Sequence, residues 1–67
     1  MLTGKVKWFN LEKGYGFIVP DDNSKDVFLH ISSLAKSGIK TVEEGQKIGY
    51  EIVNERGRES ATNIVLV

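Results

Sequence analysis

Four of the six aromatic side chains in this 67-residue chain lie close together near its start. The segment KWFNLEKGYGF, residues 7–17, contains Trp8, Phe9, Tyr15 and Phe17 together with two lysines and two glycines. Aromatic rings can stack on unpaired nucleobases, and a positively charged surface around them can follow the phosphates. These residue types therefore indicate binding of flat, anionic ligands rather than bond-breaking chemistry.

Two short strands are expected to hold most of these rings, and the alternation of side chains decides where the rings point. Alternate residues of a strand share a face, so Tyr15 and Phe17 lie together in YGFI. By the same rule, Phe28 and His30 share one face of DVFLHI, residues 26–31. The opposite faces carry the natural core residues, Ile18, Val27 and Leu29. Three rings and an imidazole are therefore expected on the outside of the sheet, where contiguous apolar patches mark binding surfaces.

The alternation leaves the position of Trp8 open. Strict alternation from Val6 places Trp8 in the core and Phe9 outside, together with Lys7. A β-bulge near Lys7 would reverse this order. Both faces therefore stay open for Trp8 at this point.

The rings on the outer face could instead be covered in one of two ways. A helix or a second sheet could cover them as a second core, but the chain has no spare element for that purpose. A second copy of the chain or a peptide could cover them, which would make the domain a protein-interaction barrel. We expect a monomer, and quenching of the single tryptophan by a short oligonucleotide would favour nucleic acid.

No group of residues in the sequence resembles a catalytic or metal-binding arrangement. Cysteine is absent and His30 is the single histidine, so a zinc-type ligand set is missing. The acidic pairs Asp21–Asp22 and Glu43–Glu44 are expected to be solvated turns, and no glycine-rich phosphate loop precedes a helix. We therefore expect no enzyme activity, no cofactor and no metal.

The length and composition indicate a single small domain over residues 1–67. Nine basic and nine acidic residues cancel, although residues 1–18 carry three lysines against one glutamate. The N-terminus MLTGKVKW lacks the apolar run of a secretory signal, and no window is apolar enough for a membrane span. We therefore expect a cytoplasmic protein with no membrane contact.

Turn signals divide the chain into five expected strands with one longer connection. Pro20 ends the second strand, because proline cannot donate a hydrogen bond to a sheet. The connection SSLAKSGIK is expected to hold one helical turn, capped by Ser32 or Ser33 and ended by Gly38. The expected strands cover residues 2–10, 15–20, 26–31, 46–53 and 60–67.

Five short strands favour a closed barrel, because an open sheet would leave two unpaired edges. The oligonucleotide-binding barrel is the common five-stranded solution, and an SH3-like barrel is the alternative. In QKIGYEIV, residues 46–53, alternation places Ile48, Tyr50 and Ile52 on one face. NERGRE, residues 54–59, is expected to be a charged hairpin loop.

KGYGFI (residues 13–18) and DVFLHI (residues 26–31) closely resemble the two ribonucleoprotein-type motifs of the bacterial cold-shock protein family. The likeness extends to GKVKWFN, TVEEGQ and EIV, and it covers essentially the full length. It implies a five-stranded antiparallel β-barrel of the oligonucleotide-binding class, an all-β fold that forms one cold-shock domain. It also implies binding of single-stranded RNA and DNA, and action as an RNA chaperone that affects transcription or translation.

The resemblance also implies a set of nucleic-acid-binding residues, and it places Trp8 on the outside. The motif positions carried over are Lys7, Trp8, Lys13, Tyr15, Phe17, Phe28 and His30. Asp26 and Arg56 match less closely, because the turns beside them vary in length.

Three departures from the family pattern affect the expected site. Tyr15 stands where phenylalanine is usual, so a ring is kept and a hydroxyl is added. Ile31 and Ile39 stand where members of the family often have phenylalanine, so these positions offer no π-face. Stacking contributes about 1–3 kcal/mol per base. We therefore expect a shorter or weaker footprint than that of a member with both rings.

Overall fold

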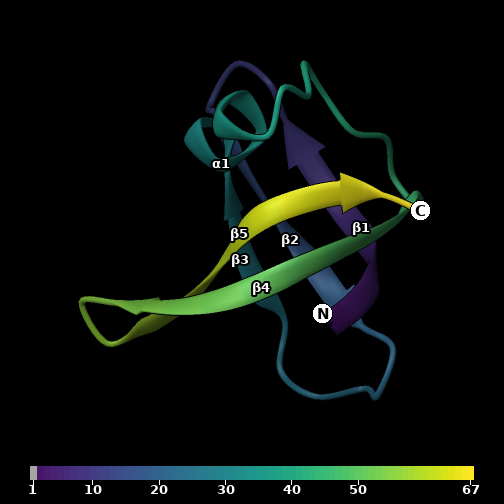
Figure 1. Cartoon of the computed structure of the whole chain (residues 1–67), viewed down its shortest axis with the longest axis vertical. Coiled ribbons are helices and arrows are strands. Elements are labelled where there is room, and N and C mark those ends of the chain that lie inside the picture. The colour runs from purple at the N-terminus through teal and green to yellow at the C-terminus, as the bar shows by residue number, and fades with distance from the viewer. Residues whose placement is uncertain (1) are drawn as a thin grey trace.

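β-forming segments separated by turn residues produce five strands and one short helix in the computed structural model, which describes residues 2–67 (Figure 1). The elements in chain order are β1 (Leu2–Asn10), β2 (Tyr15–Pro20), β3 (Val27–His30), α1 (Ile31–Lys36), β4 (Lys47–Glu55) and β5 (Arg58–Leu66). All five expected strands are present. β3 is one residue shorter at each end than expected, while β4 and β5 both extend further toward the hairpin that joins them.

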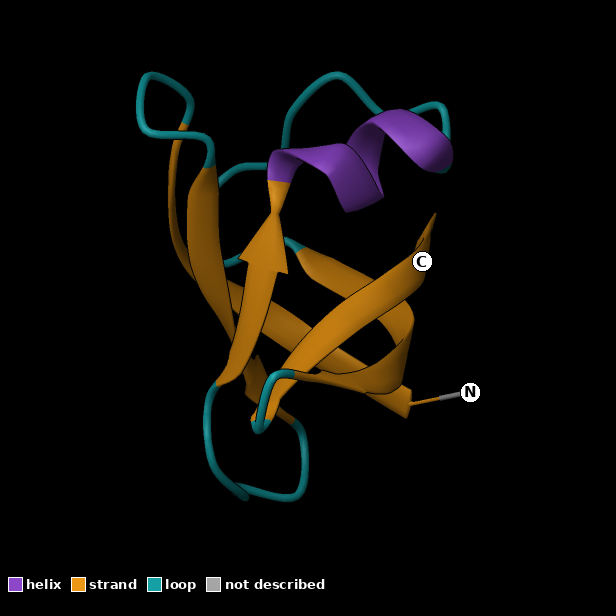
Figure 2. Ribbon diagram, turned by 90° about the vertical axis from the view of Figure 1, so that its left-hand side faces the viewer, coloured by secondary structure: helices purple, strands orange, loops and turns teal. Residues whose placement is uncertain are grey.

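The strands close into a ring in the order β1-β2-β3-β5-β4 (Figure 2). Four of the junctions are antiparallel, and the junction of β3 with β5 is parallel. One parallel junction is unavoidable, because an odd number of strands cannot alternate in direction all the way around a closed ring. The parallel junction is also the shortest, with Phe28 opposite Ser60 as its single pair.

The side chains inside the closed barrel are aliphatic, apart from one tyrosine. Ile18, Val27 and Leu29 are fully buried, as alternation predicted. Tyr50 is buried with them. The other buried hydrophobic residues are Val6, Leu34, Val42, Ile48, Ala61 and Ile64.

A β-bulge in β1 decides the position of Trp8. Val6 is paired with Ile18 and Trp8 with Phe17, so Lys7 is an extra residue with no partner on β2. Val6 is buried, and the added residue turns Trp8 to the outer face instead of the core. The outward placement that the resemblance implied is therefore confirmed.

Phe9 follows the bulge and points the other way. It is half-buried and packs against the core, which is the reversed order that a bulge at Lys7 produces, and not the outward position of strict alternation. Gly16 is its cross-strand partner on β2. A Cβ atom at Gly16 would lie 2.7 Å from the Cα of Phe9 and 2.1 Å from the carbonyl oxygen of Trp8. The glycine is therefore required for the close approach of the two strands behind the rings.

Helix α1 begins directly at the end of β3. His30 keeps an extended backbone, with φ −101° and ψ 149°, and its side chain accepts a hydrogen bond from the N–H of Ser32. The N-cap is therefore His30, and the expected cap at Ser32 or Ser33 is wrong. The strand runs into the helix without a connecting turn, so the capping position falls on the last strand residue.

The C-terminus of α1 follows the prediction. Gly38 has φ +77°, and its N–H donates to the carbonyl of Ala35. The N–H of Ile39 donates to the carbonyl of Leu34, which completes a Schellman motif. Ile39 consequently packs against the core.

Helix α1 covers the end of the ring where β3 stops pairing with β5 (Figure 2). The hydroxyl of Ser33 donates to the carbonyl of Ala61 at 2.8 Å, and the N–H of Ile64 donates to the hydroxyl of Ser37 at 2.9 Å. One serine of the helix and the serine at its C-cap thus form hydrogen bonds with backbone groups of β5 beyond the contact with β3. Leu34 inserts into the core from the same helix.

The β4–β5 hairpin projects beyond the ring (Figure 1). Its turn is formed by Arg56 and Gly57, with φ of +52° and +78°. Positive φ at both central residues is typical of a tight type I′ hairpin turn. The expected loop over residues 54–59 is therefore too long, since β4 continues to Glu55 and β5 begins at Arg58.

A second register shift lies in the β4–β5 pairing, where one β4 residue, Tyr50, lies opposite two β5 residues, Asn63 and Ile64. The pairing with β5 is irregular between Gly49 and Glu51. Ile48 and Tyr50 are buried, whereas Ile52 is 39% exposed. The extra residue is in β5, so the alternation of β4 is kept, and Ile52 lines the same hollows as Tyr50 but at a more exposed position.

Candidate nucleic-acid interface

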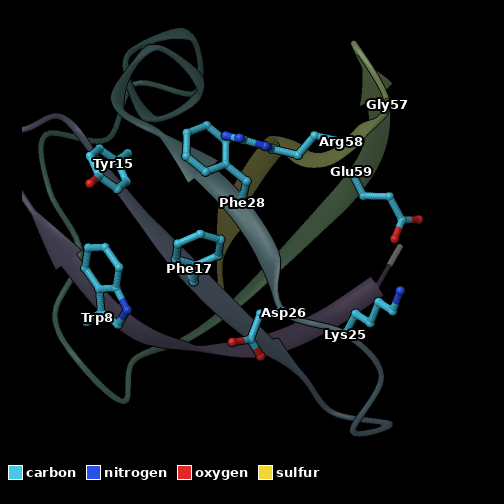
Figure 3. A pocket seen from close by; sticks show the side chains of 9 residues that line it. All are labelled: Trp8, Tyr15, Phe17, Lys25, Asp26, Phe28, Gly57, Arg58 and Glu59. Carbon is cyan, nitrogen blue, oxygen red and sulfur yellow. The ribbon is translucent and has the colours of Figure 1, made fainter.

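Five rings form a contiguous group on the outer face of β1, β2 and β3, and Figure 3 shows four of them, all except His30. We call Trp8, Tyr15, Phe17, Phe28 and His30 the aromatic platform. Neighbouring ring centroids are 5.4–6.1 Å apart, and the interplanar angles range from 29° to 71°. The first four rings are half-buried against one another and His30 is exposed. Alternation predicted this grouping for Tyr15, Phe17, Phe28 and His30, and the family resemblance added Trp8. The structure confirms that these side chains lie together.

The register of three strands places the rings side by side. Trp8 lies opposite Phe17, Phe17 opposite Phe28, and Tyr15 opposite His30. Cross-strand partners have closely spaced side chains, so each ring supports its neighbours. This mutual packing holds the rings of the platform in place beside the open groove.

An open groove of about 790 Å³ runs over the platform, within the size range of ligand sites. Four of the five rings line it, all except His30. Its other lining residues are Lys25, Asp26, Gly57, Arg58 and Glu59 (Figure 3). Flat apolar surfaces are thus combined with two cations and two carboxylates.

Arg58 is the closest cation to the rings, because its guanidinium carbon lies 4.8 Å from the centroid of Phe28. The sequence analysis missed both Arg58 and Lys25. Arg58 reaches Phe28 across the parallel junction, where Ser60 lies opposite Phe28. That junction joins segments about 30 residues apart, so the spacing of residues gives no signal for it.

Lys7 lies beside the platform but has a partner within the protein. Its Nζ is 2.9 Å from Oδ2 of Asp26, and both side chains are partly exposed. Exposed ion pairs contribute about 0.2–1 kcal/mol, so Lys7 can leave Asp26 at a small cost. Asp26 therefore lowers the net positive charge at this rim of the groove.

The remaining expected site residues lie around the groove rather than in its lining. Lys13 is exposed in the turn between β1 and β2. Ile31 is the first residue of α1, and Ile39 packs against the core. Arg56 is exposed at the tip of the hairpin and lines a second hollow with Phe28 and Arg58.

The described part of the chain contains no cluster of three or more His, Asp or Glu residues that could hold a metal ion. Within residues 2–67 no helix has both the length and the apolar character needed to cross a membrane. The groups whose pKa values are clearly shifted, Asp21, Asp22 and Tyr50, lie outside the groove lining. The chemical content of the groove is therefore aromatic stacking, cations and hydrogen bonds.

Comparison with known proteins agrees with this geometry. A family model described as the "Cold-shock" DNA-binding domain matches residues 2–67. The probable cold shock protein y4cH of Sinorhizobium fredii is 54% identical, and the match covers 96% of each chain. The cold shock-like protein CspE of Escherichia coli K12 is 50% identical over 96% of this chain and 93% of its own length. The cold shock protein CspA of Rhizobium meliloti is 48% identical, again over 96% of each chain.

The resemblance suggested by the two short motifs therefore extends along the described chain, in both sequence and fold. The matching family consists of nucleic-acid-binding proteins and not of enzymes. On these findings the chain belongs to the cold-shock domain family.

Proposed function

We propose that this protein binds single-stranded RNA and DNA by stacking unpaired bases on the aromatic platform, and that it acts as an RNA chaperone. The observation that carries the proposal is the row of rings on the outer face of three neighbouring strands, open along a groove. We propose that residues 1–67 act as one domain and as a monomer in the cytoplasm. Transcription or translation would be affected through the RNA structures that the protein opens.

The mechanism requires no covalent chemistry. Unpaired bases expose π-faces that stack on aromatic side chains, whereas bases within a duplex are already stacked and paired. A protein that binds only the unpaired form shifts the equilibrium of a hairpin toward that form by mass action. Weak, reversible stacking therefore suffices for chaperone action.

Phosphate contacts are expected to add a smaller contribution. Lys7, Lys13 and Arg56 are exposed cations near the platform, and Lys7 is partly neutralised by Asp26. Each phosphate neutralised on a single strand contributes about −0.7 to the slope of log affinity against log salt concentration. With few such contacts, the affinity should depend more on stacking than on release of counterions.

The direct test is a fluorescence titration of Trp8, which lies in the platform, with single-stranded and duplex oligonucleotides at two salt concentrations. We expect Phe17→Ala and Phe28→Ala each to weaken binding by about 1–3 kcal/mol, which is roughly fivefold to 150-fold. Val65→Ala is the matched control, because Val65 is 41% exposed on β5 and does not line the groove.

Two results would contradict the proposal. Undiminished binding by either phenylalanine variant would mean that the platform is not the binding surface. Concentration-dependent dimerisation that Phe17→Ala or Phe28→Ala abolishes would assign the platform to a protein interface. Sedimentation equilibrium with and without a short oligothymidine separates these cases.

A further inference from the structure

His30 has two structural roles at once, as a member of the aromatic platform and as the N-cap of α1. Its Nδ1 atom lies 3.1 Å from the backbone nitrogen of Ser32 and 3.0 Å from the hydroxyl oxygen of the same residue. A backbone N–H group can only donate a hydrogen bond. Nδ1 must therefore be the acceptor, without a proton of its own.

This contact determines the tautomer of the ring. A neutral imidazole carries one proton, so an accepting Nδ1 requires the proton to be on Nε2. The hydroxyl of Ser32 can rotate to donate to the same atom, which supports the same assignment. The helix terminus thus holds Nε2 as a donor and also restricts the orientation of the ring.

The ring of His30 is accessible to a ligand at the edge of the platform. His30 is exposed, and its ring centroid lies 6.1 Å from that of Phe28 with an interplanar angle of 38°. No hydrogen bond from Nε2 to another group occurs within residues 2–67. A base stacked on Phe28 would lie beside this imidazole, with one edge near an N–H group that has no other partner.

We propose that Nε2–H of His30 donates a hydrogen bond to a carbonyl oxygen of a nucleobase stacked at this end of the platform. The proposal rests on the proposed function and adds a directional contact to stacking, which by itself does not distinguish one base from another. Because the hydrogen bond from the N–H of Ser32 holds the ring in place, His30 would select for bases with a carbonyl acceptor at one position of the strand.

The tautomer can be measured on the free protein. Nitrogen-15 NMR of the neutral imidazole should show an unprotonated Nδ1 and a protonated Nε2. A ring that is mainly protonated on Nδ1 would overturn the inference, whatever the protein binds.

The contact itself can be measured with a thymine hexamer in which one base at a time is replaced by difluorotoluene, which has the shape of thymine but accepts hydrogen bonds poorly. We expect one position at which this replacement weakens binding to the wild type by about threefold to tenfold, as expected for one hydrogen bond. His30→Phe keeps a ring and removes the cap, whereas His30→Asn keeps a capping side chain and removes the ring. The loss at that position should disappear in both variants, although they change helix capping in opposite ways.

Other results would overturn the inference in distinguishable ways. An equal loss at every position in the wild type and both variants would show that His30 makes no contact with a base carbonyl. A loss caused only by methylphosphonate substitution of the backbone would assign the donor to a phosphate. Absence of binding to every single-stranded oligomer would overturn the proposed function, and this inference with it.

Discussion

The guanidinium carbon of Arg58 lies 4.8 Å from the centroid of the Phe28 ring, so a cation from β5 covers a ring on β3. An exposed cation–π contact is worth about 0.5–1 kcal/mol. A base that stacks on Phe28 must therefore displace Arg58 or stack on its guanidinium plane, and either rearrangement is inexpensive compared with a base stack of about 1–3 kcal/mol.

We expect the guanidinium of Arg58, once a base displaces it from Phe28, to pair with one phosphate of the strand. Arg58→Ala should therefore weaken binding at low salt and reduce the magnitude of the salt slope by about 0.7. At high salt the difference from the wild type should vanish or reverse, since the variant leaves Phe28 uncovered. Titrations at three salt concentrations measure both effects. Arg58→Lys, which keeps the charge and loses the plane, should retain the slope, and an unchanged slope in Arg58→Ala would contradict the prediction.

The outward position of the rings on β2 and β3 could be predicted from the sequence because both strands are regular. The alternation of Tyr15 and Phe17 with buried Ile18 continues without interruption to the end of β2. Trp8 and Phe9 could not be placed in this way, because a bulge at Lys7 reverses the alternation and no residue type announces it. The family resemblance supplied the position of Trp8, which the physical pattern did not.

The lining of the groove could not be predicted from local sequence patterns, because it depends on contacts between distant parts of the chain. Arg58 contacts Phe28 only because the five-stranded barrel closes through the parallel pairing of β3 with β5. The sequence predicted His30 as a member of the outer aromatic group. Its role as the N-cap depends on β3 running directly into α1. Non-local pairing and the junction of two elements therefore account for what the sequence analysis missed.

The second prediction concerns Gly16, behind the platform. A Cβ atom there would lie 2.1 Å from the carbonyl oxygen of Trp8 and 2.7 Å from the Cα of Phe9, and backbone atoms cannot move aside cheaply. Overpacking costs about 1–3 kcal/mol or more, against a total stability of roughly 3–10 kcal/mol for a chain of this length. Gly16→Ala should therefore lose a large part of the stability measured by urea unfolding.

Gly45→Ala is the matched control for Gly16→Ala. No atom lies within 4 Å of its added Cβ, and only the positive φ of +82° is unfavourable. This variant should lose about 1–2 kcal/mol. Equal losses at the two glycines would mean that strand contact does not explain the requirement at Gly16.

The third prediction concerns the hydroxyl of Tyr50, which is buried and has no hydrogen-bond partner within residues 2–67. Burial raises the pKa of Tyr50, so the group stays protonated with its donor unpaired. A buried unsatisfied polar group costs about 1–3 kcal/mol. Tyr50→Phe should therefore raise the free energy of unfolding by about 1 kcal/mol, or Tm by roughly 4–8 °C. Tyr15→Phe, at a half-exposed ring, should change Tm little, and a lower Tm for Tyr50→Phe would refute the prediction.

The fourth prediction concerns acid stability. A hydrogen bond from the Thr3 hydroxyl and the charge of Lys47 lower the pKa of Asp21 below its usual 3.8, and hydrogen bonds from Ser24 lower the pKa of Asp22. A lowered folded-state pKa means that the unfolded chain binds more protons as the pH falls. The stabilisation is complete above about pH 5 and is lost as the pH falls through the folded-state values.

Urea unfolding at pH 7, 4 and 3 tests this linkage. The double variant Asp21→Asn/Asp22→Asn should be less stable than the wild type at neutral pH and should lose less stability between neutral and acid pH. Parallel curves for the two proteins would show that these carboxylates do not contribute to acid unfolding.

The fifth prediction concerns the length of the binding site. Ile31 follows His30, and its N–H donates to the carbonyl of Gly14, which holds it next to the β1–β2 turn. It is half-buried, and Gly14 offers no side chain to obstruct a larger group beside it. A phenylalanine at this position would extend the platform beyond His30 by one π-face.

We expect Ile31→Phe to tighten binding to long oligonucleotides by up to about tenfold, in the lower part of the range for one stacked base, because part of the new ring stays buried. The gain should be small for oligomers too short to reach the added ring, so titration against increasing length measures the change in site size. Val65→Phe adds a ring on β5 away from the groove and controls for non-specific stacking. Ile39→Phe should give a smaller gain, because Ile39 packs against the core as part of the helix C-cap. Equal affinity and equal site size for the wild type and Ile31→Phe would show that isoleucine at this position does not limit the footprint.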